Sequence, residues 1–222
     1  MKDSLRPIAA FAGALMVFGG WAQSNLEPLP LSLPKPLFEG TPANLKVPNL
    51  EKPLGKPRPP FLAPAGVTNL ALGKPVSSTT AEPTIGELEM ITDGNKAGID
   101  GSFVEIGTGL QSVTIDLKQK STIYAIAVWH YHKQARVYSH VVVQVADDAD
   151  FLTNVRTLFN NDRDNAAGLG IGKDLNYIET NEGKLIDAKG VVARYVRLYS
   201  DGNDTNGLNH YVEVEVYGKP AQ

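Results

Sequence analysis

The sequence predicts an all-β protein in which two antiparallel sheets pack face to face. Three observations predict this fold class. Apolar and polar residues alternate along several segments after residue 67, turn-forming residues separate these segments, and the helical patterns are few and short. The chain has 222 residues, 42% hydrophobic and 20% charged, as is usual for a globular protein. This length suits one domain of about 150 residues with an extension.

The first segment, residues 1–22, has the features of a secretory signal peptide. Lys2 and Arg6 precede an apolar stretch, and small residues lie three and one positions before a possible cleavage point ahead of Gln23. An uncleaved anchor is the alternative, but about 15 apolar residues are fewer than the ~20 that a membrane-spanning helix needs. We therefore expect a secreted, periplasmic or cell-surface protein with no transmembrane segment after signal cleavage.

The second segment, residues 23–66, is predicted to be a proline-rich extended linker. Eleven of the fifteen prolines lie between residues 24 and 64. Proline fixes φ and has no amide donor, so neither a helix nor a central strand is expected. A semi-rigid spacer in the polyproline II conformation is expected instead. A ligand for proline-recognising domains is the alternative.

The composition excludes several functions. The net charge of -3 gives no general attraction to nucleic acid, so no nucleic-acid partner is expected. The chain has no cysteine, which excludes disulfides, thiolate zinc sites and cysteine nucleophiles. An exported protein without disulfides indicates a bacterial-type envelope or exterior.

The third segment, residues 67–220, carries the strand patterns. The predicted strands are 113–117, 123–130, 141–145, 191–199 and 211–217. In the last of these, Val212, Val214 and Val216 are expected to point inward. Short helices are expected only around residues 87–91 and 151–158, which excludes the βαβ units of a nucleotide-binding sheet.

Five short motifs follow one another along this domain: NLALGKPV at 69–76, ITDGN at 91–95, VTIDL at 113–117, RYVRL at 194–198 and VEVEVYG at 212–218. Together they resemble the discoidin, or coagulation factor 5/8 type C, family. The resemblance implies a jelly-roll β-sandwich of the galactose-binding-domain type, which binds sugars, lipid headgroups or proteins and does not catalyse a reaction. The chain departs from the family pattern at 107–111, which lacks a tryptophan, and at 160–183, which is longer and more polar.

The loop at residues 92–98 carries the candidate metal ligands. A carboxylate, an amide and turn carbonyls are the hard oxygen ligands that Ca²⁺ prefers. The resemblance implies a structural calcium between this loop and a glutamate of the last strand. Asp93 and Glu213 would then be the side-chain ligands, with Asn95 and Gly98 as further contributors. The alternative is an ordinary Asp-Gly turn beside an outward-facing glutamate.

Other polar runs give weaker patterns. The runs 162–167 and 201–207 lack the spacing of an EF-hand and are predicted to be solvated turns, with a second metal as the alternative. The glycine-rich run 168–173 lacks the first glycine and the Ser or Thr of a phosphate loop. No spaced carboxylate pair or Ser, His and Asp group indicates catalysis.

The histidines and aromatic residues provide the candidate ligand site. Aromatic rings stack on the apolar faces of sugars, while His and Arg donate hydrogen bonds to hydroxyl groups. The candidate residues are Trp129, His130, Tyr131, His132, Arg136, His210 and Tyr211. Two alternatives are that Trp129 or Tyr131 fills the core, and that His130 and His132 bind zinc with His140 or His210.

These patterns lead to one main hypothesis for the function. The chain is expected to be an exported, non-catalytic binding module that recognises an extracellular or cell-wall glycan and holds a structural calcium. An adhesive or structural surface protein whose sandwich docks a protein partner is the alternative. A small hydrolase is the third hypothesis.

Overall fold

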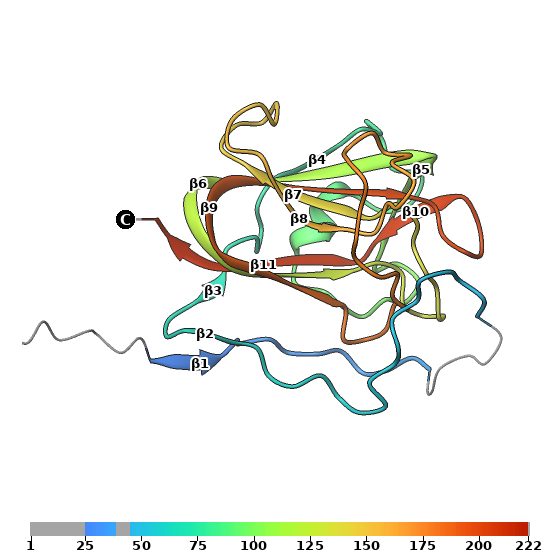
Figure 1. The fold of residues 1–222 in the computed structure, drawn as a ribbon, viewed down its shortest axis with the longest axis horizontal. Coiled ribbons are helices and arrows are strands. Elements are labelled where there is room, and N and C mark those ends of the chain that lie inside the picture. The colour runs from blue at the N-terminus through green and yellow to red at the C-terminus, as the bar shows by residue number, and fades with distance from the viewer. Residues whose placement is uncertain (1–24, 39–44, 222) are drawn as a thin grey trace, which may run out of the picture.

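The protein is described by a computed structural model that covers residues 25–38 and 45–221 (Figure 1). The predicted signal peptide, residues 1–22, lies outside these residues. The described part of the chain contains one helical element, the 3₁₀ helix η1 (Leu88–Thr92), near the expected position 87–91. No helix in the described ranges is long and apolar enough to cross a membrane.

All other regular elements are strands. Their bounds are β1 (Leu26–Pro28), β2 (Leu62–Pro64), β3 (Thr68–Asn69), β4 (Val76–Ser78), β5 (Val104–Thr108), β6 (Leu110–Trp129), β7 (Val142–Ala146), β8 (Arg156–Asn160), β9 (Lys184–Asp201), β10 (Leu208–Tyr211) and β11 (Glu213–Pro220). All their ladders are antiparallel, and the main sheet has the order β3-β11-β6-β9-β7-β8, with β4 beside β6.

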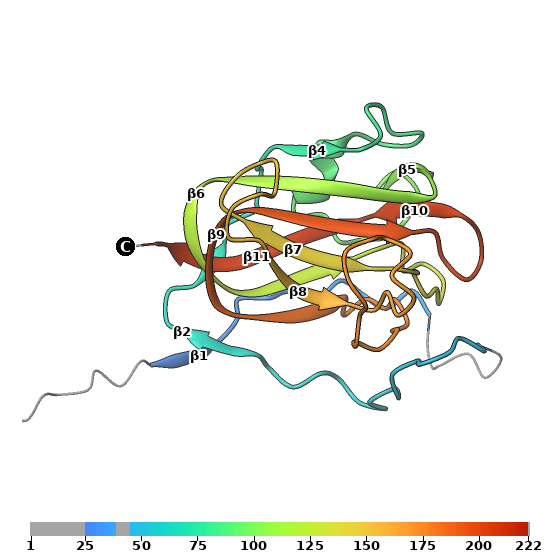
Figure 2. The same cartoon turned by 45° about the horizontal axis from the view of Figure 1, so that its top comes forward.

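Two long strands, β6 and β9, belong to both layers of the sandwich. One half of each strand pairs with the other around Ile115 and Val196, next to β4 and β7. The remaining half of β6 lies between β11 and the remaining half of β9. The register shifts between Asp116 and Ser121, where Lys118 has a φ of 69°. This irregularity lets the strands curve from one layer into the other, as Figures 1 and 2 show.

The core lies between the two layers, as the alternating pattern predicts. Val214 and Val216 point into this main core. Val212 does not, because it packs in a second apolar cluster on the outer face of the same layer. The expectation that all three valines share one face is therefore wrong at Val212, which precedes the first residue of β11.

One predicted helix does not form. Residues 151–158 turn through Phe151 and Asn154, both in the left-handed region with φ of 57° and 53°, and then enter strand β8. Several consecutive amide groups at this turn donate to Asp148, including those of Leu152 and Thr153. The aspartate therefore satisfies the local backbone donors and favours a turn over a helix.

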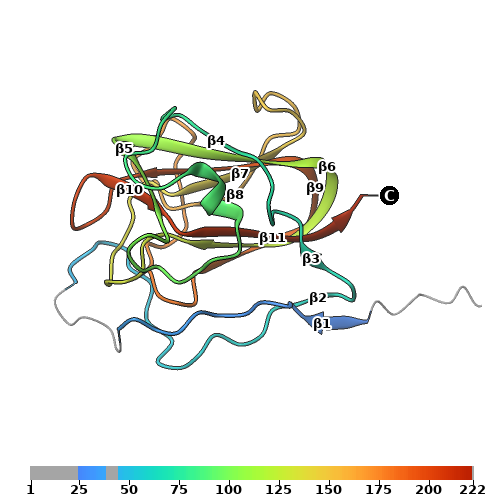
Figure 3. The same ribbon diagram turned by 180° about the vertical axis from the view of Figure 1, so that it is seen from behind.

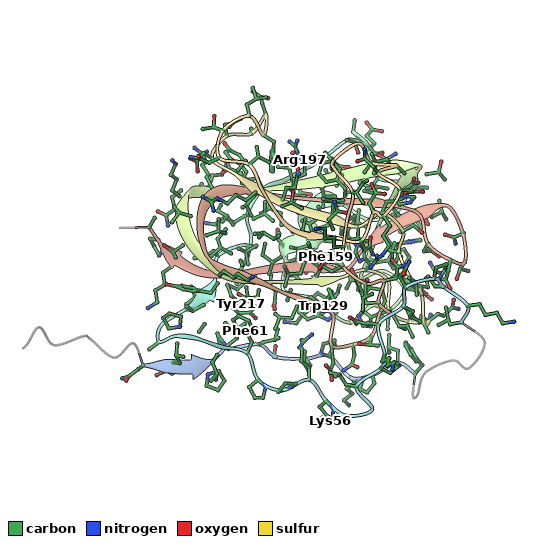
Figure 4. The ribbon with its side chains drawn as sticks, in the orientation of Figure 1. Lys56, Phe61, Trp129, Phe159, Arg197 and Tyr217 are labelled. Carbon is green, nitrogen blue, oxygen red and sulfur yellow. The ribbon has the colours of Figure 1, made fainter. Side chains whose placement is uncertain are left out.

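The described part of the proline-rich segment, residues 25–38 and 45–66, is here called the strap. It lies along the outer face of the lower layer in Figures 1 and 2, with β1 paired to β2. Leu29, Leu31 and Phe61 of the strap pack on the second apolar cluster, which contains Trp129 and Tyr217. Figure 4 shows Phe61 below these two rings. The described strap therefore does not extend away from the sandwich as a spacer would.

Polar contacts also hold the strap to the loop before β9. Arg58 Nη1 donates to the carbonyl of Gly183 at 2.8 Å, and Asn181 Nδ2 donates to the carbonyl of Pro34 at 3.0 Å. Lys184 forms an ion pair of 2.7 Å with Glu51. These contacts join the extension to the domain at several points along its length.

Candidate metal and ligand sites

The predicted metal loop lies against β11. Asp93 follows the last residue of η1, and the chain then turns so that Gly94 N donates to Glu213 Oε2 at 3.1 Å. Asn95 N donates to Asp93 Oδ1 at 2.7 Å, which closes a tight turn. Figure 3 shows η1 and β11 as neighbours in the fold. The fold thus brings together Asp93, Asn95 and Glu213, which are far apart in the sequence.

Glu213 is fully buried and only half satisfied. Its Oε1 atom has no hydrogen-bond partner among the described residues. Burial, opposed by the hydrogen bond from Gly94 N and aided by the negative charges of Glu215 and Asp93, raises the pKa of Glu213 to about 9. The nearby Lys96 forms an ion pair of 2.6 Å with Glu215. An orphaned buried carboxylate oxygen beside an oxygen-rich loop fits a bound cation.

Gly98 occupies a crowded position at the end of this loop. Its φ is 65°, and a Cβ there would lie 2.5 Å from Nε2 of His132. The same imidazole nitrogen lies 3.0 Å from the carbonyl oxygen of Lys96. A larger residue at position 98 would therefore displace the histidine that contacts the loop.

Five of the seven candidate ligand residues lie in one cluster of ring contacts: His130, Tyr131, Arg136, His210 and Tyr211. Most of the seven are buried. Of the seven, only Arg136 is partly exposed. Four side chains are fully buried: Trp129, His130, His132 and Tyr211. Trp129 lies in the second apolar cluster beneath the strap, and its Nε1 donates to the carbonyl of Asn181 at 2.9 Å. Trp129 therefore fills an apolar core, as one of the two alternatives predicted, and does not lie in an open ligand loop.

A buried polar network connects the histidines. His130 Nδ1 lies 2.6 Å from Glu179 Oε1, and its ring stacks on Tyr138 at 4.4 Å. His210 lies between Tyr138 OH at 2.9 Å and Glu105 Oε2 at 3.1 Å. Burial lowers the pKa of His210 to about 4, because a desolvated imidazolium is disfavoured. The network holds neutral His210 in one orientation.

Sequence reasoning did not identify three members of this network: Glu105, Tyr138 and Glu179. Each is at least 49 residues away from the histidine to which it is hydrogen-bonded, and none belongs to a recognisable motif. Only a strand pairing such as that of His210 with Glu105, between β10 and β5, brings them together.

The accessible rim of the cluster consists of aromatic rings and one arginine. The guanidinium carbon of Arg136 lies 4.5 Å from the centre of the Tyr131 ring. Phe103, which is partly exposed, meets Tyr131 edge to face with ring centres 5.0 Å apart. The Nε and Nη1 atoms of Arg136 have no hydrogen-bond partner among the described residues. Both of these nitrogen atoms are buried, so the part of the rim that solvent reaches is Phe103 and the rest of the Arg136 side chain.

A separate hollow of about 590 Å³ lies between the strap and the loop that leads into β9. Lys184 and Tyr177 both line this hollow, and Lys184 Nζ lies 4.8 Å from the centre of the Tyr177 ring. None of the seven predicted ligand residues lines this hollow. We favour the rim as the candidate ligand site because it places a partly exposed aromatic ring, Phe103, near a partly exposed arginine, Arg136.

No protein-family model matches the chain, and no curated protein matches its sequence. Solved structures do match. A fucose binding module of Streptococcus pneumoniae has 20% identity and a TM-score of 0.50, with 69% of this chain and 96% of that chain covered. The CBM32 of AlyQ in complex with 4,5-unsaturated mannuronic acid has 17% identity and a TM-score of 0.47, with 64% and 92% covered. Chitosan-binding module 1 from a chitosanase/glucanase of Paenibacillus sp. IK-5 has 22% identity and a TM-score of 0.46, with 68% and 99% covered.

These matches concern the fold. The match to the fucose binding module confirms the predicted fold class, an antiparallel β-sandwich. The three solved modules are matched over 92%, 99% and 96% of their own length.

Proposed function

We propose that this chain is an exported, non-catalytic module that binds carbohydrate at the rim formed by Phe103, Tyr131 and Arg136. The fold supports the proposal, because a solved module with this fold is named for binding fucose. Export rests on the signal-like residues 1–22, and the absence of cysteine in an exported chain favours a bacterial-type envelope or exterior. The ligand would then be a glycan outside the cell or in its wall.

The observation that carries this proposal is the partly exposed Arg136, whose guanidinium lies over the Tyr131 ring near the partly exposed Phe103. Sugars present an apolar face to aromatic rings and hydroxyl oxygens to donors, and the rim offers both. The buried candidates have another role here. His130, His132 and His210 support the rim from below through their hydrogen bonds and do not contact the sugar.

We further propose that calcium binds between Asp93 and Glu213, with Asn95 and Gly98 contributing backbone carbonyls. The side-chain oxygen of Asn95 already accepts the amide of Ala97 at 3.1 Å, which leaves its carbonyl for this purpose. The ion would supply positive charge to the orphaned Oε1 of Glu213. It would thereby tie the loop after η1 to β11.

The test of the glycan site is a conservative substitution at the rim. Arg136→Lys keeps the charge but removes the planar fork, so we expect at least tenfold weaker binding to the oligosaccharide that the parent chain binds. Arg156→Lys, at an exposed arginine of β8, is the matched control and should bind as the parent does. Isothermal titration calorimetry measures both. Unchanged affinity in a folded Arg136→Lys variant would place the glycan elsewhere.

A further inference from the structure

Three strands of the upper layer meet in register at one end of the sandwich. Val142, the first residue of β7, lies opposite Asn160, the last residue of β8. On its other side, Val142 lies opposite Tyr199 of β9. Backbone hydrogen bonds continue these ladders beyond the named strands, from Asn161 N to the carbonyl of Val141 at 3.1 Å. The segments therefore leave the sheet side by side.

Two residues beyond these paired positions, the same three segments present His140, Asp162 and Asp201. Because side chains alternate along paired strands, these positions share a face with the paired residues before them. Asp164 follows two residues after Asp162. The antiparallel register thus gathers one imidazole and three carboxylates at a single place on the sheet end.

The distances within this group suit a metal ion. His140 Nε2 lies 3.3 Å from Asp164 Oδ1 and 3.9 Å from Asp162 Oδ1. The three ligand atoms all lie within 4.8 Å of one another. Ligands at ~2.1 Å around a tetrahedral zinc ion are roughly 3.4 Å apart, so small movements would complete the coordination.

The other nitrogen of the same ring supports this assignment. His140 Nδ1 lies 3.4 Å from Asp201 Oδ2, outside the group of three ligands. A metal-bound histidine usually donates its second ring N–H to a carboxylate, which sets the tautomer and the ring orientation. Asp201 is placed to accept that hydrogen bond while Nε2 faces the two remaining carboxylates.

The charge balance independently indicates a cation. Asp162 is fully buried, and its two oxygens accept the amides of Ala166 and Ala167 at 3.0 Å and 2.8 Å. Within the described ranges, the ion pairs of Asp162, Asp164 and Asp201 all involve His140 and no lysine or arginine. A buried carboxylate beside other acids is costly without a neighbouring cation.

Arginine does not fill this role, although one stands between the two acids in the sequence. Arg163 Nη2 donates to the carbonyl oxygens of Lys173 and Asp174 at 3.0 Å and 3.2 Å. Its charge is thereby directed to the backbone of the loop and away from the carboxylates. Within this cluster, His140 is the one side chain that can carry a positive charge.

We propose that His140, Asp162 and Asp164 bind a zinc ion, and that Asp201 orients the imidazole. A mixed set of imidazole and carboxylate ligands suits zinc better than calcium, which prefers oxygen alone. Asp164 is 75% exposed at its side chain, so the ion faces solvent and keeps a position for water. This site is distinct from the calcium loop, which lies against β11 of the other layer.

The test is a calorimetric titration of the chelator-treated chain with zinc. We expect one saturable site, with at least tenfold weaker binding in His140→Asn and in Asp164→Asn. Asparagine tolerates the left-handed backbone of residue 140, whose φ is 49°, so the first variant should fold. Asp150→Asn, an exposed acid in another loop, and Asp93→Asn, in the calcium loop, should keep the parent affinity.

Two results would overturn the zinc site. One is the absence of saturable zinc binding by the folded parent chain. The other is an affinity that neither His140→Asn nor Asp164→Asn changes. Nuclear magnetic resonance of the His140 ring gives a separate measurement: zinc should hold Nε2 without a proton as the pH falls to 6. A ring that becomes protonated at both nitrogens in the presence of zinc would show an ion pair only.

Discussion

Glu213→Gln should stabilise the calcium-free protein and abolish its response to calcium. Glutamine has the shape of glutamate, keeps an acceptor for Gly94 N and carries no charge. In the folded chain, burial raises the pKa of Glu213 from 4.5 to about 9. At pH 7.5 the folded state therefore holds a proton that the unfolded state has released. Under this condition the glutamate lowers the free energy of unfolding, and the glutamine does not.

The magnitude follows from the proton linkage. Each pKa unit between the two states is worth about 1.4 kcal/mol, so the raised pKa costs roughly 4 kcal/mol at pH 7.5. The sign is that of a carboxyl whose pKa is raised by folding. Calcium-free stability should fall as the pH rises from about 5 to 9, and the substitution should remove this fall. Calcium at about one hundred times its Kd should add about 2.7 kcal/mol to the parent alone.

Urea unfolding at pH 6 and pH 8, with chelator and with calcium, measures all four conditions. Glu89→Gln, at an exposed glutamate of η1, is the matched control and should respond to calcium as the parent does. The reasoning fails if Glu213→Gln is less stable than the parent in chelator at pH 8. It also fails if the variant keeps the full calcium-dependent increase.

Three further predictions concern buried groups. Trp129→Ala should lower the free energy of unfolding in urea by about 3 to 5 kcal/mol, because the ring fills the cluster on which the strap packs. The substitution should also increase proteolysis of the strap, and equal proteolysis in both proteins would contradict this. Gly98→Ala should weaken calcium binding severalfold in calorimetry, since its Cβ would collide with His132. In the Glu213→Gln background, the free energy of unfolding should fall by up to about 1.4 kcal/mol per pH unit as the pH is lowered from about 6.5 to 4. In this range His210 gains a proton in the unfolded state but not in the folded state. Stability that is flat over this range would contradict the assigned burial.

Strand alternation was the most informative sequence signal. The predicted strands 113–117 and 123–130 are two halves of the single strand β6, and the break between them is the bend at which it changes layer. The short strands β5, β8 and β10 were not predicted, although the equally short β7 was. Their positions depend on pairing with distant segments.

The position of the strap had one signal in the sequence. Residues 123–129 are apolar on both faces: Ile126 and Val128 point into the main core, while Ala125, Ala127 and Trp129 form the outer cluster. A strand of this kind needs cover on both sides. The prolines indicated the extended backbone correctly, but no periodic pattern shows which surface an extended chain will cover.

The candidate site was predictable only in part. The order of the motifs brought Asp93 and Glu213 together in the prediction, and the fold places them close, with the loop amide bonded to the glutamate. The aromatic and histidine cluster was identified as a group, and one alternative placed Trp129 or Tyr131 in the core, but the burial of the histidines was not foreseen. The burial arises from packing with Glu105, Tyr138 and Glu179, whose contacts depend on the tertiary fold.

Direct measurement of glycan binding tests the central claim. The purified chain, with calcium and with chelator, would be applied to an array of bacterial cell-wall, plant and animal glycans, and each signal would be checked by calorimetry. The account predicts saturable binding to at least one glycan class, weakened by Arg136→Lys and not by Arg156→Lys. No saturable binding to any glycan by the folded, calcium-loaded chain would contradict it and would favour a protein partner.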